Sequence, residues 1–322
     1  MRIFRHIADI PAAFKGAVVA IGNFDGVHLG HQALIGQALM HSDARNAPLA
    51  VLCFEPSSRE FFRPGAEPFR LTPFRAKAHL VATLGADAMF ALPFDVEMAR
   101  RSAQEFVSDI LLRDLQVGCV VVGSDFRFGK GRAGDGTVLS YMGEMEGFGV
   151  DIFPTVMAGK DEKISSTLIR TLLKEGKPDE AARLLGHSFV IEGRVEHGEK
   201  RGRTLGFATT NMHLDGYIRP AFGIYAVRVS VIRDDLVMAR YDGVSNLGVR
   251  PMYLLREPLL ETHLFDFDGD LYDKHLAVEL ISYIRAEVKF ASADELRAQI
   301  ARDIEKAKEV LRQPASPPED GH

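Results

Sequence analysis

Residues 22–31 of this chain read GNFDGVHLGH. The apolar run AVVAI at residues 17–21 precedes this segment and predicts a short buried strand, and residues 32–40 predict a helix, so the segment is a strand-to-helix turn. Its three glycines let the backbone approach a ligand, and the start of a helix offers unpaired N–H groups and a positive dipole end. His28 and His31, three positions apart, can face the same ligand. The turn is therefore a candidate phosphate site, although it is not a Walker loop because no GK[ST] follows.

Composition limits the classes of function. The chain has 322 residues, enough for two domains, and its 39 basic and 44 acidic residues give a net charge of −5 without a broad basic surface for nucleic acid. Cys53 and Cys119 each lie in an apolar run, which predicts buried free thiols in a reducing compartment. No run approaches the roughly 20 apolar residues of a membrane span, and the N-terminus does not resemble a signal peptide. We expect a cytoplasmic protein with small-molecule substrates and no nucleic-acid or membrane partner; the oligomeric state cannot be read.

The first half of the chain alternates short apolar runs with helical patterns, which predicts an α/β domain with a parallel sheet. The expected strands cover residues 18–21, 49–54, 88–92, 120–123 and 151–153, and the expected helices cover 72–84, 102–112 and 137–147. Ligands of such sheets sit beyond the carboxyl ends of the strands. The segments that follow the strands are therefore the places to look for chemistry.

Three more segments that follow predicted strands carry residues that could bind a ligand. Residues 54–62 read FEPSSREFF, and residues 123–130 read GSDFRFGK, where aromatic and charged side chains alternate in a loop that a planar ligand could use. Residues 164–170 read ISSTLIR, so three hydroxyl side chains lie at a helix start and Arg170 follows within two turns. Hydroxyls at such a place are usually caps, but Arg170 could bind triphosphate oxygens.

The pattern of apolar and polar residues changes near Gly186, after a short helix expected over residues 178–185. Alternating strands at residues 189–195, 223–231, 237–244 and 276–284 predict a small antiparallel β-barrel or sandwich, which ends in a long helix opened by a capping box at residues 292–295. We therefore expect domains over residues 1–185 and 186–312, and a disordered polar tail over residues 313–322. Within the second domain, the glycine-rich and basic loop at residues 198–211 suits phosphates and a metal ion, and Glu279 is a carboxylate on a predicted strand.

These motifs together resemble the bacterial bifunctional riboflavin kinase/FMN adenylyltransferase family, often called FAD synthetase. HxGH at residues 28–31 is similar to the signature of the nucleotidylyltransferase superfamily, and GNFDGVHLGH, FEP, GSDFRFG and ISSTLIR occur in the order of the family's N-terminal half. The kinase half of the family carries GxxxGRxLGFPTAN and a catalytic glutamate on a later strand. Residues 198–211, 243–251 and 261–272 match that half, so the resemblance covers essentially the whole chain except the tail.

The resemblance implies an N-terminal Rossmann-like nucleotidylyltransferase domain, a riboflavin kinase barrel, and a two-step conversion of riboflavin to FMN and then FAD, with ATP as co-substrate and Mg²⁺ as cofactor. It implies that the histidines His28 and His31 and the base Glu279 are catalytic, and that Thr209 and Asn211 hold the metal ion. The flavin-binding residues would be Asp125, Phe126 and Arg127. The expected ATP and phosphate ligands are Gly22, Phe24, Asp25, Gly26, Ser165, Ser166, Thr167, Arg170, Gly202, Arg203 and Gly206.

The chain departs from the family at two places. FEPHP is replaced by Phe54-Glu55-Pro56-Ser57-Ser58, and the PTAN tetrad is replaced by ATTN at residues 208–211. Two alternatives stay open: a single-function nucleotidylyltransferase fused to an unrelated β domain, and a flavin-binding or regulatory protein whose catalysis has decayed. The retained ligating groups and Glu279 favour the bifunctional enzyme.

Overall fold

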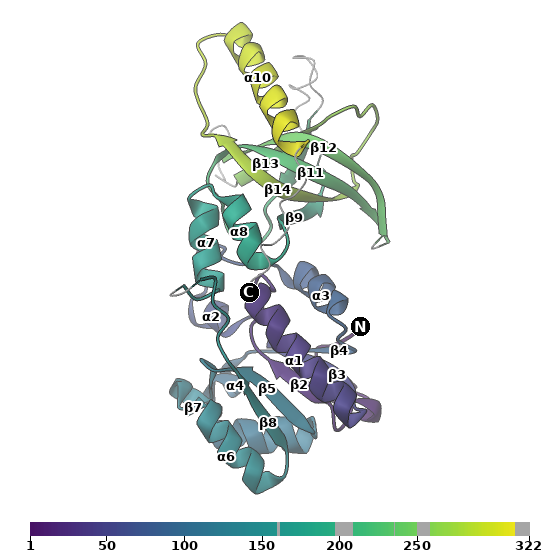
Figure 1. Ribbon diagram of the computed structural model, residues 1–322, viewed down its shortest axis with the longest axis vertical. Helices are drawn as coiled ribbons and strands as arrows, with labels where there is room; N and C mark the ends of the chain where they lie inside the picture. Colours follow the sequence, from purple (N-terminus) through teal and green to yellow (C-terminus); the bar gives the residue numbers. More distant parts are fainter. Residues whose placement is uncertain (160–161, 197–208, 235, 250–257, 313–322) are drawn as a thin grey trace. The chain divides into compact units, whose positions relative to one another are not determined.

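The computed structural model describes residues 1–159, 162–196, 209–234, 236–249 and 258–312. The chain forms two compact units, each described here by itself. The first unit contains Met1–Glu67 and Thr72–Ser165, and the second contains Pro68–Leu71 and Ser166–His322. The prediction of an α/β domain followed by an antiparallel β domain with a C-terminal helix is confirmed (Figure 1).

A six-stranded parallel sheet forms the centre of the first unit, in the order β1-β4-β3-β2-β5-β8. Four of the five predicted strands agree with the structure to within one residue at each end, because each is a short apolar run buried on both faces. The strand at the N-terminus was not expected, since only three residues form it. The bounds are β1 Arg2–Phe4, β2 Val18–Ile21, β3 Leu49–Phe54, β4 Ala88–Leu92, β5 Cys119–Gly123 and β8 Gly149–Phe153.

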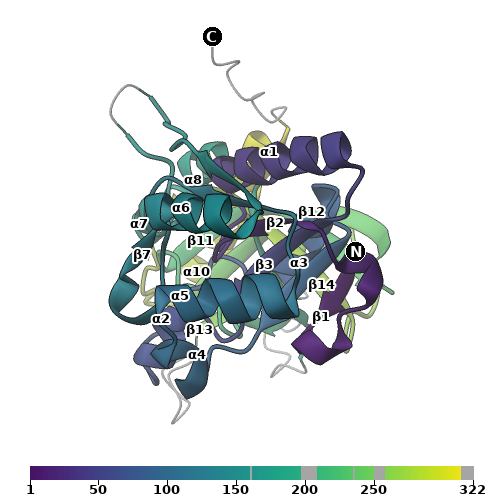
Figure 2. The ribbon, with the colours of Figure 1, turned by 90° about the horizontal axis from the view of Figure 1, so that it is seen from below.

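Helices cover both faces of this sheet (Figure 2). Alternate strand residues contribute to two cores: Val18 and Val51 pack with α1, whereas Val19 and Leu52 pack with the helices on the opposite face. Cys53 and Cys119 are buried free thiols, as predicted. The helices are α1 Leu29–Arg45, α2 Ser58–Phe62, α3 Phe74–Thr83, α4 Val96–Arg100, α5 Ala103–Glu105, the π-helical η3 Phe106–Asp114 and α6 Gly136–Glu146, with short 3-10 turns η1 Ile7–Asp9, η2 Ala12–Phe14 and η4 Lys130–Arg132.

Ser57 stands where the resemblance leads one to expect histidine, and it caps α2. Its hydroxyl accepts a hydrogen bond from the Glu60 N–H at 3.4 Å, and the Glu60 carboxylate accepts one from the Ser57 N–H at 2.9 Å. This capping box satisfies two N–H groups that a helix of this length would otherwise leave to water. The substitution therefore has a local structural role.

A polar contact joins α1 to the edge strand β8. The His41 Nε2 atom lies 2.6 Å from Asp151 Oδ2, and the Gln37 amide donates to the same oxygen at 2.8 Å. Burial alone would raise the pKa of Asp151, but the hydrogen bonds from His41 and Gln37 outweigh it and hold the pKa below its usual value. The contact therefore stabilises the fold most when this carboxylate is ionised.

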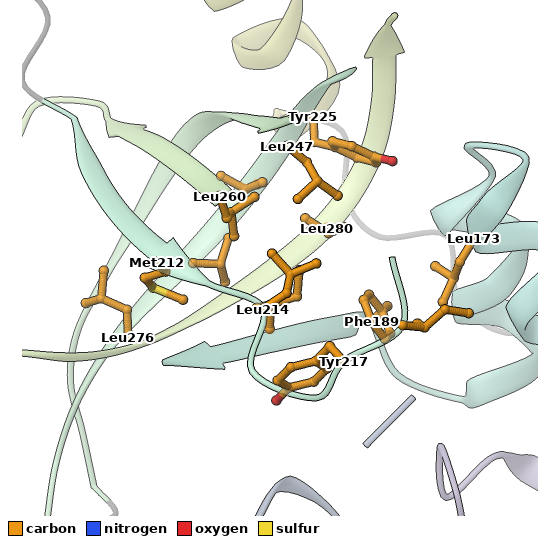
Figure 3. Close-up of a cluster of buried hydrophobic side chains, with 14 of the residues drawn as sticks. Leu173, Phe189, Met212, Leu214, Tyr217, Tyr225, Leu247, Leu260, Leu276 and Leu280 are labelled. Carbon is orange, nitrogen blue, oxygen red and sulfur yellow. The ribbon is translucent and has the colours of Figure 1, made fainter. Parts of the chain in front are cut away.

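The second unit is built on an antiparallel sheet in the order β10-β13-β12-β11-β14-β9, and an isolated bridge between Glu196 and Asn211 links its two ends. Figure 3 shows the side chains of Met212, Leu247, Leu260 and Leu280 directed into one shared interior. The strands are β9 Phe189–Arg194, β10 Thr210–His213, β11 Gly223–Arg233, β12 Leu236–Val249, β13 Pro258–Leu264 and β14 His275–Arg285; a separate hairpin in the first unit is formed by β6 Arg127–Phe128 and β7 Gly134–Asp135.

Helices α7 Ser166–Lys174 and α8 Pro178–Leu185 belong to this second unit. Leu173 and Leu185 are buried in the barrel core, and so is Leu71 from the short segment Pro68–Leu71. The boundary between the two compact units therefore falls after residue 165, whereas the pattern of apolar and polar residues changes near residue 186. The division into functional domains at residues 185 and 186 stays a prediction.

The C-terminal helix α10 Ala293–Leu311 covers the other face of the sheet and packs on β11, β12 and β14 (Figure 1). Its apolar side faces the sheet, where Ala307 and Leu311 are buried. Arg285 of β14 binds the buried Asp303 through two hydrogen bonds, at 2.9 and 2.6 Å. Ser292 accepts from the Glu295 N–H as expected, but the Glu295 carboxylate accepts from Ala291 instead of closing the capping box.

Candidate functional sites

The turn at residues 22–31 lies where the order of the parallel sheet reverses. Strand β2 pairs with β3 on one side and with β5 on the other, so the connections leaving β2 and β5 run in opposite directions across the sheet. A crevice opens at such a point beyond the carboxyl ends of the strands, and ligands of open α/β sheets bind there. The turn after β2 and the GSDFRFG loop after β5 flank this position.

The two histidines of the turn form a stacked pair. Their ring centroids are 3.6 Å apart and the ring planes differ by 15°. His28 is the N-cap of α1, and its Nδ1 atom accepts a hydrogen bond from the His31 N–H at 3.3 Å. A Cβ atom at Gly30 would lie 3.2 Å from the His28 ring, so glycine keeps this space open. The structure thus brings both predicted histidines together at the start of a helix.

The backbone of the turn is strained. Phe24 and Val27 have positive φ angles of 49° and 42°, a region that costs a residue with a branched or bulky side chain on the order of 1–3 kcal/mol. Buried hydrogen bonds hold the turn: Gly26 N–H donates to Thr72 Oγ1 at 2.8 Å, and Thr72 N–H donates to Asp25 Oδ1 at 3.0 Å. The strained turn is therefore fixed to Thr72, two residues before α3 begins.

The surroundings of His31 disfavour the charged form of its ring. Burial, followed by the charges of His28, Lys77 and Lys163, holds the pKa of His31 well below its usual value. Its Nδ1 atom is buried and has no hydrogen-bond partner in the described part of the chain. A buried polar atom without a partner costs free energy, and such an atom at a helix start suits a ligand that completes its hydrogen bonding.

The GSDFRFG loop contains β6, which pairs with β7 in a short antiparallel hairpin. Asp125 accepts a hydrogen bond from the Lys163 ammonium at 2.5 Å, and this bond, together with the nearby cations, lowers the pKa of Asp125. Arg127 pairs with Asp135 at 2.5 Å. The structure therefore places the three predicted flavin residues together, with their two charged members already in ion pairs at the surface.

Phenylalanine rings join this loop to the segment after β3. Phe126 stacks on Phe128 with centroids 5.4 Å apart, and further contacts run through Phe106 to Phe54. From Phe54 the contacts continue to Phe94, Phe61 and Phe62, and Phe62 is 64% exposed. Sequence reasoning missed this row because its members come from four separate segments. Phe106 and Phe128 belong to the buried core, and the row reaches the surface at Phe62.

The expected ATP ligands at residues 165–170 fall on both sides of the packing boundary. Ser165 belongs to the first unit, and Ser166, Thr167 and Arg170 belong to α7 of the second. The Arg170 Nε–H donates to the Phe69 carbonyl at 2.8 Å, and its guanidinium lies 5.3 Å from the Phe69 ring centroid. Their assignment to the nucleotide stays a prediction.

A row of polar side chains lies on the outer face of the barrel sheet. Asn211 of β10 is paired with Glu261 of β13, and Glu261 is paired with Asn246 of β12. Their neighbours Met212 and Leu260 point into the core, so alternation directs all three polar side chains outward. Residues opposite each other on one face have Cβ atoms about 5 Å apart. Asn211 is buried, and Thr209 lies two positions before it.

Glu279 lies elsewhere on this sheet. Glu279 is paired with Arg228 of β11. Asn246 of the polar row is paired with Ile224, which lies four residues before Arg228 on the same strand. Glu279 and Glu261 are three strand spacings apart across the sheet and four residues apart along a strand, so their backbones are about 20 Å apart along the sheet. The route through β9 gives a similar separation, since Glu279 pairs with Val190 and Asn211 bridges to Glu196. Glu279 therefore lies apart from Asn211, and its role as the base stays a prediction; Glu261, beside Asn211, is a second candidate.

The sequence held a signal for Glu261, because it lies in the segment ETHLFDFDGDLY that matched the kinase half. The pairing of β10 with β13 joins segments fifty residues apart, and no local pattern encodes that register. Gly202, Arg203 and Gly206 lie outside the described residues. Among the described residues, no group of three or more His, Cys, Asp or Glu side chains could hold a metal ion by itself.

Two family models match the chain. The FAD synthetase model matches residues 10–168, and the riboflavin kinase model matches residues 185–311. These ranges contain the histidine pair and the Asn211–Glu261 row, respectively.

Similar proteins cover nearly the whole chain. The bifunctional riboflavin kinase/FMN adenylyltransferase of Escherichia coli K12 is 42% identical over 97% of this chain and 98% of its own length, and that of Pseudomonas fluorescens is 39% identical over 96% and 97%. A solved structure described as a macrolide-efflux protein from Streptococcus pneumoniae has a TM-score of 0.84 and 29% identity, covering 97% of this chain and 98% of that one. In the described part of this chain, no helix is long and apolar enough to cross a membrane. The extent of the match over both halves places this chain in the bifunctional riboflavin kinase/FMN adenylyltransferase family.

Proposed function

We propose that this protein phosphorylates riboflavin with ATP to give FMN, and then adenylylates FMN with a second ATP to give FAD and pyrophosphate. The observation that carries the proposal is the presence of two separate polar sites in two separate units. One is the stacked histidine pair at the switch point of the parallel sheet, and the other is the Asn211–Glu261 row on the barrel. We assign the two activities to residues 1–185 and 186–312.

The histidine pair supports adenylyl transfer. The attacking group is the FMN phosphate, which is already ionised at neutral pH, so the reaction needs charge stabilisation more than a base. His28 and His31 would donate hydrogen bonds to the α-phosphate and the departing pyrophosphate, with the N–H groups at the start of α1 beside them. We assign Gly22, Phe24, Asp25 and Gly26 to the loop around the phosphates.

The outer ligands of this site are also proposals. We assign Ser165, Ser166, Thr167 and Arg170 to the ATP phosphates, because a guanidinium fork and hydroxyls suit phosphate oxygens. The aromatic row supports binding of the isoalloxazine ring near Asp125, Phe126 and Arg127, because a flat conjugated ring gains contact area on phenylalanine faces. The exposed Phe62 offers a face for such contact.

The barrel row supports phosphoryl transfer. A riboflavin hydroxyl must lose a proton as it attacks the γ-phosphate, and the Glu261 carboxylate, beside Asn211, can accept that proton. The residues fit Mg²⁺, because amide, hydroxyl and carboxylate oxygens are its usual ligands and it commonly retains water and phosphate oxygens. Thr209 and Asn211 would hold the ion, which when bound would offset charge on the transferring phosphoryl group. We also assign Gly202, Arg203 and Gly206 to the ATP phosphates of this step.

One assay tests the proposal. The full-length protein is incubated with riboflavin, ATP and Mg²⁺, and the flavins are separated by chromatography. We expect FMN to appear first and FAD to follow. Conversion of supplied FMN without any conversion of riboflavin would indicate a single-function adenylyltransferase, and binding of flavin without either product would indicate a protein with decayed catalysis.

A further inference from the structure

Lys77 is a buried cation that neither the sequence motifs nor the proposed mechanism explains. It lies on α3, between the buried residues Ala76 and Ala78, and it is only 4% exposed. A lysine is almost never fully buried unless it is paired. Within the described ranges, its ammonium has no ion pair within 4.0 Å and no hydrogen bond. Its Nζ atom is not among the described side-chain nitrogens that are buried without a hydrogen-bond partner, so the aliphatic stem is buried while the ammonium still reaches solvent. An ammonium held in this way is open to an anionic ligand.

The position of Lys77 connects it to the histidine turn. Thr72, just before α3, accepts from the Gly26 N–H and donates to Asp25, so the start of α3 is held against this turn. Ala78 and Val81 of α3 share one apolar core with Phe24 and Val27. Lys77 is in the second turn of α3, and helical side chains point back toward the N-terminus, which here is the end nearest the turn.

Lys77 lies within electrostatic range of His31. The positive charge of Lys77 acts on the His31 imidazole, together with that of Lys163. The buried Nδ1 atom of His31 has no partner in the described part of the chain. An anion with several oxygens at the start of α1 would supply the missing hydrogen bond to His31 and would attract the Lys77 ammonium.

We propose that the Lys77 ammonium contacts the phosphate chain of ATP at the His28–His31 site and is a binding residue for the adenylyl transfer. A triphosphate provides the missing negative charge to Lys77 and hydrogen-bonding oxygens to His31. The inference rests on the proposed adenylyltransferase function of this site.

The test uses the full-length protein and three substitutions at this position: Lys77→Met, Lys77→Gln and Lys77→Arg. Lys15→Met is the matched control, because Lys15 is an exposed lysine of the same unit. For each variant, kcat and KM for ATP and for FMN are measured in FAD formation from supplied FMN. The melting temperature without ligand and the rate of riboflavin phosphorylation are recorded in parallel.

We expect Lys77→Met and Lys77→Gln to lower kcat/KM for ATP about 10–100-fold, as expected for a lost charged hydrogen bond. The melting temperature should stay nearly equal, because the ammonium has no ion pair or hydrogen bond to lose in the described part of the chain. Riboflavin phosphorylation should be unchanged, and Lys77→Arg should recover part of the loss. Lys15→Met should match the unaltered protein in every measurement.

Three results would overturn the proposal. An unchanged kcat/KM for ATP in both neutral variants would show that Lys77 does not contact the nucleotide. A lower melting temperature with equal losses in Lys77→Met, Lys77→Gln and Lys77→Arg would show a packing role. A rise of KM for FMN alone would place the ammonium on the other phosphate. Absence of FAD formation in the unaltered protein would instead refute the underlying function.

Discussion

Glu261→Gln is the sharpest test of the kinase site, because it keeps the shape of the side chain and removes its ability to accept a proton. Glu261 is paired directly with Asn211 on the neighbouring strand, so the two side chains are close enough to contact the same ligand. Loss of a general base typically lowers kcat about 10²–10⁴-fold, which corresponds to roughly 3–5 kcal/mol in the activation barrier. We expect FMN formation to fall by this factor.

Glu279→Gln is the matched control, because the same chemical change is made on the same face of the same sheet. A base must lie within about 3 Å of the proton it accepts, and Glu279 lies about 20 Å from Glu261 along the sheet. We therefore expect a change of no more than about twofold, typical of a surface substitution. Initial rates of FMN formation and circular dichroism spectra are measured for both variants.

The opposite result would refute the reasoning from strand register. If Glu279→Gln abolished FMN formation while Glu261→Gln left it intact, the proton would be accepted at the far position. FAD formation from supplied FMN is the internal control, since both variants should retain it.

Three further predictions concern other contacts. Gly30→Ala should lower FAD formation about 10-fold or more and spare FMN formation, because a Cβ atom 3.2 Å from the ring displaces His28; equal rates of both products in variant and parent would contradict this. Asp303→Ala should lower the free energy of unfolding in urea by about 3 kcal/mol, because the Arg285 guanidinium loses its carboxylate partner. An unchanged urea midpoint would show that the ion pair makes no net contribution to stability. Asp151→Asn should lower the melting temperature near neutral pH, and the difference should vanish as the pH falls below about 4, since a depressed carboxyl pKa contributes stability only above it; a difference that persists in acid would contradict the shift.

The sequence predicted the parts of the fold that depend on local patterns. Strand β3 was predicted at its observed bounds because LAVLCF is apolar throughout, and α8 was predicted at its bounds because Pro178 and Gly186 mark its ends. The His28–His31 pair was expected from spacing, and the structure stacks the two rings.

The rest depends on partners that are distant in the sequence. Alternation assigns Glu279 and Glu261 alike to an outward face, and only the register of four strands separates them. The same limit hid Lys77, because a lysine among alanines on an amphipathic helix reads as a solvated side chain until the burial of α3 is known. Gly202, Arg203 and Gly206 lie outside the described residues, so their assignment to the ATP phosphates stays a prediction.

The short segment Pro68–Leu71 restricts how this protein can be divided. It lies in sequence between two parts of the first unit, yet Leu71 is 1% exposed in the core of the second, and the Arg70 carbonyl accepts a hydrogen bond from the Ile218 N–H at 2.7 Å. A stop codon or a protease cut at any one peptide bond therefore cannot release both units whole. A gene fragment that begins at residue 186 would encode a barrel without Leu71, α7 and α8, leaving apolar core surface exposed to water. Recombination between relatives should succeed more readily when residues 68–71 and 166–312 are inherited from the same parent.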